Sequence, residues 1–273
     1  GRTSLAFNTT ASNNTAVGLS ALGANTTGAS NVAVGYASLN TNTTGAQNIG
    51  VGQGALYYNT TGADNVAIGF ESLQANQTAS NNTAVGKAAL KANTTGTQNT
   101  ALGSISLDAN TTGSENTAVG YGALSTNTTA AGNTAMGWYS MFATTTGYAN
   151  VAVGLSALGA QTTGYENVAL GHQALDALTT GNLNTAVGRS AGGLITTGIR
   201  NTLVGSLAGD ALTTSLDNVA IGSHALSTET TGKYSTAVGQ GALFTQNAGS
   251  DTSVYNTAVG YNTGNLITTG VQN

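Results

Sequence analysis

The sequence predicts an all-β fold, a parallel β-solenoid, because it repeats itself every 17 residues from end to end. Each repeat reads N(T/V)AVGxxALxxNTTGxx in consensus, and we number its positions 1 to 17 from the opening asparagine. Alternating runs such as TAVG are typical of short strands, proline is absent, and no 3.6-residue apolar stripe indicates a helix. We therefore expect about 16 coils, each with a strand, a turn and a second extended segment.

Position 1 predicts a ladder of stacked side chains. Asparagine stands there at Asn14, Asn31, Asn48, Asn65, Asn82, Asn99, Asn116, Asn133, Asn150, Asn167, Asn184, Asn201, Asn218 and Asn256. Ser235 takes this position once, immediately before a four-residue insertion that lies between 235 and 256. Asparagine side chains stacked at the strand spacing hydrogen-bond from coil to coil, so we expect this column to hold the register.

Position 5 predicts a corner of the coil. It is glycine at Gly18, Gly35, Gly52, Gly69, Gly86, Gly103, Gly120, Gly137, Gly154, Gly171, Gly188, Gly205, Gly222, Gly239 and Gly260. A column that accepts no Cβ in any copy indicates a positive φ or a close approach of two backbones.

Positions 4 and 9 are the expected core. Position 4 is aliphatic or methionine in every complete coil, so we expect a buried column, with the alanine at position 3 facing neighbouring chains. Position 9 is leucine or methionine except in three coils, where glycine accompanies an aliphatic residue at position 12. These pairs are Gly192 with Ile195, Gly209 with Leu212, and Gly264 with Ile267. A packed interior requires such a swap, because a leucine-sized cavity costs about 2–5 kcal/mol.

The strings NTAVG, NVAVG and NVAIG followed by an AL pair resemble the head repeats of trimeric autotransporter adhesins. The form NTAVGYxAL…NTTG is similar to repeats of phage tail-fibre and bacterial surface-fibre proteins. The resemblance covers essentially all of residues 1–273, although the adhesin-head repeat is shorter. It implies a left-handed β-roll, a homotrimeric rod, and a location outside the cell, on its surface or in a virion tail fibre. We expect residues 1–273 to form one continuous domain within a longer fibre.

The composition argues against several classes of function. Only 6% of residues are charged, and the six basic residues are scattered, so no nucleic-acid surface is expected. The chain has no cysteine for disulfides or thiolate metal sites, and no apolar run long enough for a membrane span. We expect no cofactor and no metal.

The repeat also does not bring side chains that could act in catalysis close to one another. Position 17 carries Asp64, Glu115, Glu166 and Asp217, but successive carboxylates lie three coils, roughly 14 Å, apart. That exceeds the ~5–10 Å separation of a glycosidase pair. His172 and His224 lie far apart, so we expect a non-enzymatic protein.

Two further columns leave alternatives open. Glycosylation sequons fall at position 12 at Asn8, Asn25, Asn42, Asn59, Asn76, Asn93, Asn110 and Asn127, with others at Asn13 and Asn81. They are either a decorated stripe or turn-forming repeats, and we favour the second reading. Aromatic residues near position 6 either contact a glycan or seal a seam between protomers. The candidates for glycan contact are Tyr121, Trp138, Tyr139 and His172.

The expected function is structural or adhesive, with copies of the chain as partners and weak contact to a cell-surface glycan or receptor. One alternative is an ice-binding solenoid, but adjacent threonines such as Thr26 and Thr27 face opposite ways on extended backbone. A second alternative is a self-assembling extracellular filament, since uncapped coils stack end to end. The insertion, with Asp251 and Tyr255, is either a neutral surface loop or a binding loop.

Overall fold

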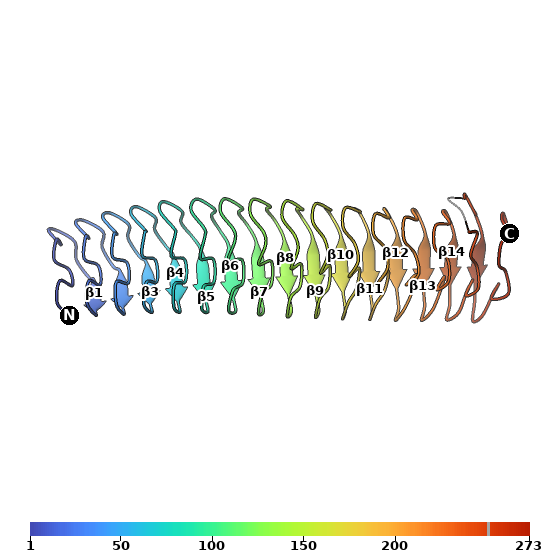
Figure 1. Ribbon diagram of the computed structural model, residues 1–273, viewed down its shortest axis with the longest axis horizontal. Helices are drawn as coiled ribbons and strands as arrows, with labels where there is room; N and C mark the ends of the chain where they lie inside the picture. The colour runs from blue at the N-terminus through green and yellow to red at the C-terminus, as the bar shows by residue number, and fades with distance from the viewer. Residues whose placement is uncertain (250–251) are drawn as a thin grey trace. The chain divides into compact units, whose positions relative to one another are not determined.

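The computed structural model describes residues 1–249 and 252–273 and confirms a parallel β-solenoid with a 17-residue repeat (Figure 1). No helix occurs among the described residues. The chain divides into two compact units, Gly1–Asn133 and Thr134–Asn273. Asp251, which belongs to the insertion, lies outside the described residues.

The first unit contains one three-residue strand in each of seven successive coils. Its strands are β1 Thr15–Val17, β2 Val32–Val34, β3 Ile49–Val51, β4 Val66–Ile68, β5 Thr83–Val85, β6 Thr100–Leu102 and β7 Thr117–Val119. Each strand pairs in parallel with the next at the repeat interval, so that Thr15 lies opposite Val32. Equivalent residues of successive coils therefore form straight columns.

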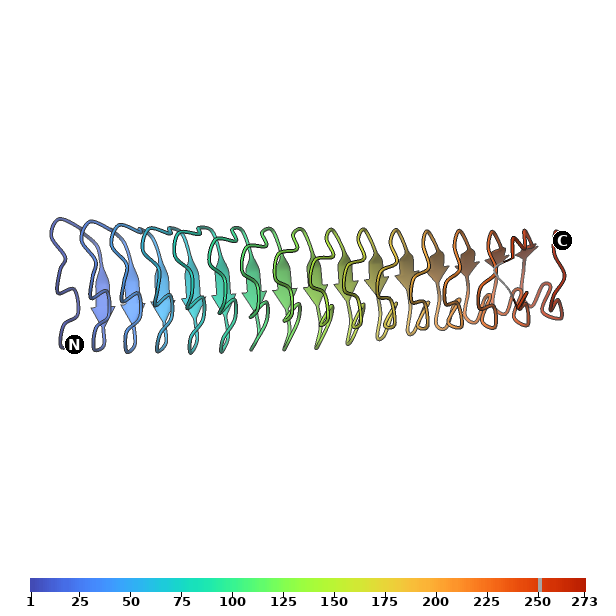
Figure 2. The ribbon, with the colours of Figure 1, turned by 45° about the horizontal axis from the view of Figure 1, so that its top comes forward.

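The second unit continues the same construction and absorbs the insertion. Its strands are β8 Thr134–Met136, β9 Val151–Val153, β10 Val168–Leu170, β11 Thr185–Val187, β12 Thr202–Val204, β13 Val219–Ile221, β14 Thr236–Val238 and β15 Thr257–Val259. Although the insertion separates β14 from β15, Thr236 still pairs with Thr257 (Figure 2). The strand register is therefore kept across the insertion.

The expectation that position 4 is buried and position 3 faces outward is wrong, because the structure shows the reverse. The position 3 alanines, such as Ala84 and Ala152, are fully buried, whereas the position 4 residues Val17 and Val259 are 56% and 67% exposed. The reason is the position 9 leucine, such as Leu90, which is fully buried and fills the interior opposite the strand. The remaining space accepts a methyl group but no larger side chain in most coils.

The exchange between positions 9 and 12 is confirmed. A Cβ built on Gly192 would lie 3.0 Å from Ile195 Cδ1 and 2.7 Å from Leu203 Cδ1. A Cβ on Gly209 would lie 2.7 Å from Leu212 Cδ1. The aliphatic side chain at position 12 therefore occupies the interior space that a position 9 leucine fills in other coils, and Leu203 replaces the usual alanine beside it.

The corner glycines meet both expectations for their column. Gly35 has a φ of 132°, and a Cβ there would lie 2.6 Å from the carbonyl oxygen of Gly52 in the next coil. A further feature is that the position 9 leucines are themselves left-handed, with a φ of 51° at Leu90. This conformation costs roughly 1–2 kcal/mol per residue, which burial of a leucine, at about 1.5–3 kcal/mol, offsets.

Candidate functional site

The predicted asparagine ladder at position 1 is present, and it is part of the structure's interior. The backbone amide of Asn65 donates to Asn48 Oδ1 at 3.0 Å, and its Nδ2 donates to the same oxygen at 3.1 Å and to the carbonyl of Ala79 at 2.9 Å. These side chains are fully buried from Asn31 onward in the first unit. The ladder is therefore a register device, and no ligand reaches it.

A second ladder runs through position 12, and sequence reasoning missed it. Asn42 Nδ2 donates to Asn25 Oδ1 at 2.8 Å and to the carbonyl of Gly45 at 2.9 Å, and the pattern continues to Asn127. Asn25 and its equivalents up to Asn127 are fully buried. The constant spacing of the NTT strings could have predicted this ladder. We interpreted the strings as sequons or turn-forming repeats instead. The exposed sequon asparagines are Asn13 and Asn81.

The same repeat position carries a buried carboxylate, Glu229, in the coil before the insertion. Glu229 Oε1 accepts hydrogen bonds from the amides of Thr230 at 3.0 Å and Gly232 at 2.8 Å. Gln246 Nε2 donates to Glu229 Oε2 at 3.1 Å and to Ser235 Oγ at 2.9 Å. The glutamine thus reaches the place where serine has replaced a position 1 asparagine, so the substitutions compensate one another.

The four residues predicted to contact a glycan are divided between the two units, with Tyr121 in the first unit and the others in the second. Trp138 and Tyr139 have ring centroids 4.4 Å apart, and Trp138 is 50% exposed. His172 is exposed two coils further along the second unit. Tyr121 is exposed on the first unit. Trp138 and Tyr139, which are neighbours in sequence, are in ring contact.

Two pairs of oppositely charged side chains are in contact among the described residues. Arg200 binds Asp217 through two hydrogen bonds of 2.7 Å, and this guanidinium holds the pKa of the Asp217 carboxyl below its ordinary value. Lys91 Nζ lies 2.7 Å from Glu71 Oε2. Within residues 1–249 and 252–273, no three histidine, cysteine, aspartate or glutamate side chains gather where they could hold a metal ion. The same residues contain no helix of sufficient length and hydropathy to cross a membrane.

The outward strand face is the most regular surface feature of each unit. Positions 2 and 4 carry only threonine and aliphatic residues or methionine, and none is charged. Leu102 in the first unit and Met136 in the second are 47% and 43% exposed. Successive coils repeat these side chains at about the strand spacing of 4.8 Å. Contiguous apolar surface of this kind marks interaction sites in soluble proteins.

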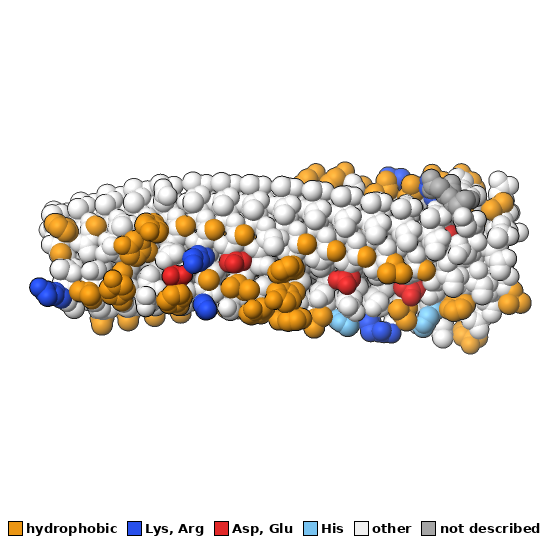
Figure 3. Space-filling model, viewed as in Figure 1, with side chains coloured by type: hydrophobic (Ala, Val, Ile, Leu, Met, Phe, Trp, Pro, Cys, Tyr) orange, Lys and Arg blue, Asp and Glu red, His pale blue; other side chains and the backbone are white. Residues whose placement is uncertain are grey.

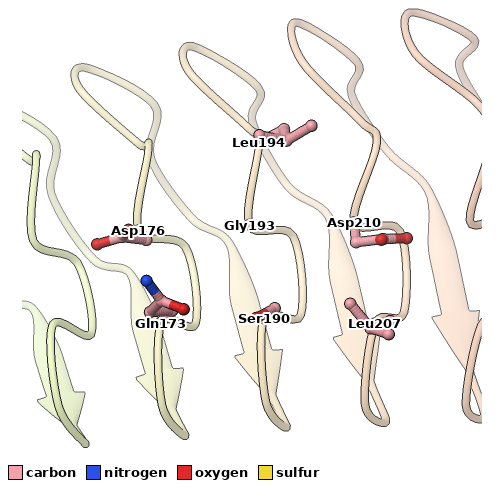
Figure 4. A pocket seen from close by; sticks show the side chains of 7 residues that line it. All are labelled: Gln173, Asp176, Ser190, Gly193, Leu194, Leu207 and Asp210. Carbon is pink, nitrogen blue, oxygen red and sulfur yellow. The ribbon is translucent and has the colours of Figure 1, made fainter.

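A second surface is formed by positions 7 and 10, which flank the buried leucine column. Figure 3 shows one face of the protein, where isolated acidic groups lie among clusters of apolar side chains. Glycine at position 10 leaves notches between bulkier neighbours, as at Gly159 and Gly193. Figure 4 shows the Gly193 notch, of about 230 Å³, between Asp176 and Asp210.

No protein-family model matches the chain, and neither a curated protein nor a solved structure matches it. The fold is therefore shown by the coordinates alone. The functional conclusion depends on two surfaces of its coils, the outward strand face and the notched face.

Proposed function

We propose that the chain is a non-enzymatic structural segment of an extracellular, cell-surface or virion fibre, which associates with copies of itself through the outward strand face. The observation that carries this proposal is the uncharged apolar column at position 4, from Val17 to Val119 in the first unit and from Met136 to Val259 in the second. Weak adhesive contact with a glycan or receptor is an additional role of the same segment.

The energetics favour self-association through this face. Each position 4 side chain still exposes enough area for its burial to contribute on the order of 1 kcal/mol, at about 25 cal/mol per Å². Seven coils in one unit and eight in the other repeat that contribution. The total is comparable to the estimated 4–15 kcal/mol cost of association, which a short or interrupted stripe does not reach.

The chemistry of the face also fits a copy of the same chain. A partner with a complementary charge has nothing to recognise, because positions 2 and 4 are uncharged in every strand. Two or three identical faces bury each other without unpaired charges, and closed symmetry is the usual outcome for such contacts. The resemblance to trimeric fibre proteins leads us to propose three chains.

The threonine geometry favours the fibre over ice binding. At position 13, Thr43 Oγ1 donates to the carbonyl of Thr60 in the next coil at 3.1 Å, so this hydroxyl is engaged within the stack. At position 14, Thr44 and Thr61 are exposed in single file. A crystal lattice is matched by two parallel rows on one plane, and this column supplies one.

Sedimentation velocity of the purified chain tests the proposed function. A particle of three 26.8 kDa chains supports it. A monomer that depresses the freezing point in a thermal-hysteresis assay would replace it with the ice-binding alternative. A monomer without that activity also contradicts self-association.

A further inference from the structure

The Gly159 notch of the second unit combines an aromatic wall, a bare floor and a carboxylate. Position 10 carries Phe142, Gly159 and Asp176 in three successive coils. Together with nearby residues they line an open surface depression of about 400 Å³. The other lining residues are Tyr139, Ser156, Ala160 and Ala177. The two walls are two coil spacings, roughly 9–10 Å, apart along the stack.

One wall of the notch is a cluster of three aromatic rings. The Tyr139 and Phe142 ring centroids lie 4.8 Å apart at an interplanar angle of 72°, and Trp138 extends the cluster at 4.4 Å from Tyr139. Phe142 is 41% exposed. Because the Tyr139 and Phe142 rings meet edge to face, they leave no space between them to enclose a cation, and a flat apolar group can stack on the exposed face of Phe142.

The opposite wall is the Asp176 carboxylate, which is aimed into the notch. A Cβ built on Gly159 would lie 2.7 Å from Asp176 Oδ1, so this oxygen is directly above the glycine floor. Figure 4 shows the Asp176 side chain pointing away from Gly193 and toward the preceding coil. No side-chain or backbone donor among the described residues contributes a hydrogen bond to this half-buried carboxylate. Burial raises its pKa, while the charge of His172 acts in the opposite direction.

The neighbouring notch lacks this combination. At Gly193 the walls include Leu194 and Leu207, and no aromatic residue lines the pocket. Asp210 accepts a short hydrogen bond from Ser227, so its carboxylate is already engaged. Asp176 lines both notches, so the aromatic wall is what distinguishes the Gly159 notch from the Gly193 notch.

We propose that the Gly159 notch binds a sugar residue of a neutral glycan, whose apolar ring face stacks on the exposed Phe142 ring, with Tyr139 packed edge to face against that ring, and whose hydroxyls donate to Asp176. A sugar presents these two chemistries on one rigid ring, and small-molecule sites commonly combine aromatic lining with a few polar groups. An anionic sugar is disfavoured because its carboxylate would face that of Asp176. The coil spacing also resembles the length of one sugar residue in an extended chain, so neighbouring residues of the glycan follow the notched face.

The notch stays accessible if the strand faces associate. Positions 8 and 9 of each coil point inward onto the strand's buried alanine, so positions 7 and 10 beside them face away from the sheet. This proposal deepens the adhesive role of the proposed fibre segment. It concerns a separate surface from self-association, so the two fail independently.

The test is isothermal titration calorimetry with soluble neutral hexasaccharides of glucose, mannose, galactose and N-acetylglucosamine. A hexamer of galacturonic acid and choline chloride are the competing probes. At least one neutral hexasaccharide is expected to bind, and Gly159→Asn, which fills the notch, should weaken that binding tenfold or more. Asparagine is compatible with position 10, where Asn40 stands in the first unit. Gly23→Asn, at the same repeat position in the first unit, is the matched control and should leave binding unchanged.

Two further variants separate the walls. Phe142→Ala and Asp176→Asn should each weaken binding at least tenfold, whereas Phe244→Ala and Asp108→Asn, at the same repeat position, should not. Circular dichroism melts establish that each variant is folded. The proposal is overturned if no neutral hexasaccharide binds, if only galacturonate or choline binds, or if Gly159→Asn and Gly23→Asn behave alike. Sedimentation velocity on the same samples reports self-association separately.

Discussion

Ile195 Cδ1 lies 3.0 Å from the point where a Cβ on Gly192 would stand. The two residues belong to one coil, and together they fill the interior space that the leucine at position 9 fills in other coils. Gly192 has a φ of 59°, close to the 51° of Leu175 in the preceding coil. The backbone at position 192 is therefore already suited to leucine.

A leucine at position 192 should compensate for the loss of the isoleucine side chain at position 195. Ile195→Asn removes a fully buried side chain and should lower the free energy of unfolding by about 2–5 kcal/mol. In a Leu203→Ala background, which removes the contact 2.7 Å from the built Cβ, adding Gly192→Leu should recover most of that loss, while Gly192→Leu alone should destabilise by overpacking. Urea unfolding midpoints of these variants and of the Leu203→Ala background measure this. With Leu203→Ala present in both, a variant carrying Ile195→Asn and Gly192→Leu that is no more stable than one carrying Ile195→Asn alone would contradict the shared space.

The asparagine ladder should not tolerate aspartate. Asn99 Nδ2 donates to Asn82 Oδ1 at 3.2 Å and to the carbonyl of Gly113 at 2.9 Å, in a fully buried setting. Asn99→Asp loses both donors and buries a charge, so we expect a loss of about 3 kcal/mol or more in denaturant unfolding. Gln98→Glu, one residue earlier and exposed, is the control and should change stability by less than about 0.5 kcal/mol. Equal losses of stability in the two variants would contradict the structural role of the ladder.

Glycan attachment should follow burial. When the chain is produced in a glycosylating secretory cell, the soluble folded fraction should carry N-linked sugar at Asn81 and none at Asn93. Asn81 is exposed, whereas Asn93 Nδ2 donates to Asn76 Oδ1 at 3.1 Å inside the second ladder. Peptide mass spectrometry measures the occupancy. Modified Asn93 in folded protein would show that the second ladder is dispensable.

The Arg200–Asp217 pair predicts a small acid sensitivity. Arg200 lowers the pKa of Asp217 in the folded chain below its ordinary value of 3.8. The pair therefore stabilises the fold above that pH and loses its contribution as pH falls from 3.8 through the folded pKa. Wild type should melt slightly higher than Asp217→Asn at pH 6, and the difference should shrink toward pH 2. The effect is small because the pair is exposed. A difference that grows in acid would reverse the assigned sign.

Much of the fold could be predicted because the repeat exposes its constraints as columns. The period predicted the coil, the Gly35 column the corner, the Asn48 column the ladder, and Gly192 with Ile195 the interior exchange. Alternation alone does not say which face is inside, since a period of two is satisfied either way. Val153 was therefore assigned to the core and Ala152 to the surface, the reverse of what the structure shows.

The notch at Gly159 was beyond sequence reasoning for a different reason. Phe142, Gly159 and Asp176 share position 10, so their column was readable. What the sequence did not contain was the direction of the Asp176 side chain over the glycine, or the contact of Phe142 with Tyr139. The aromatic residues predicted to contact a glycan stand near position 6, whereas the notch is built on position 10.

The most direct test of the central claim, self-association through the outward strand face, is sedimentation equilibrium of a charged-face variant. Val153→Lys with Leu170→Lys places two charges on strands β9 and β10 without touching the buried alanines. The matched control is Thr163→Lys with Thr180→Lys, at exposed positions of the same coils. We predict a three-chain particle for wild type and control and a folded monomer for the strand-face variant. A wild-type monomer, or a strand-face variant with the same mass as wild type, would contradict the account.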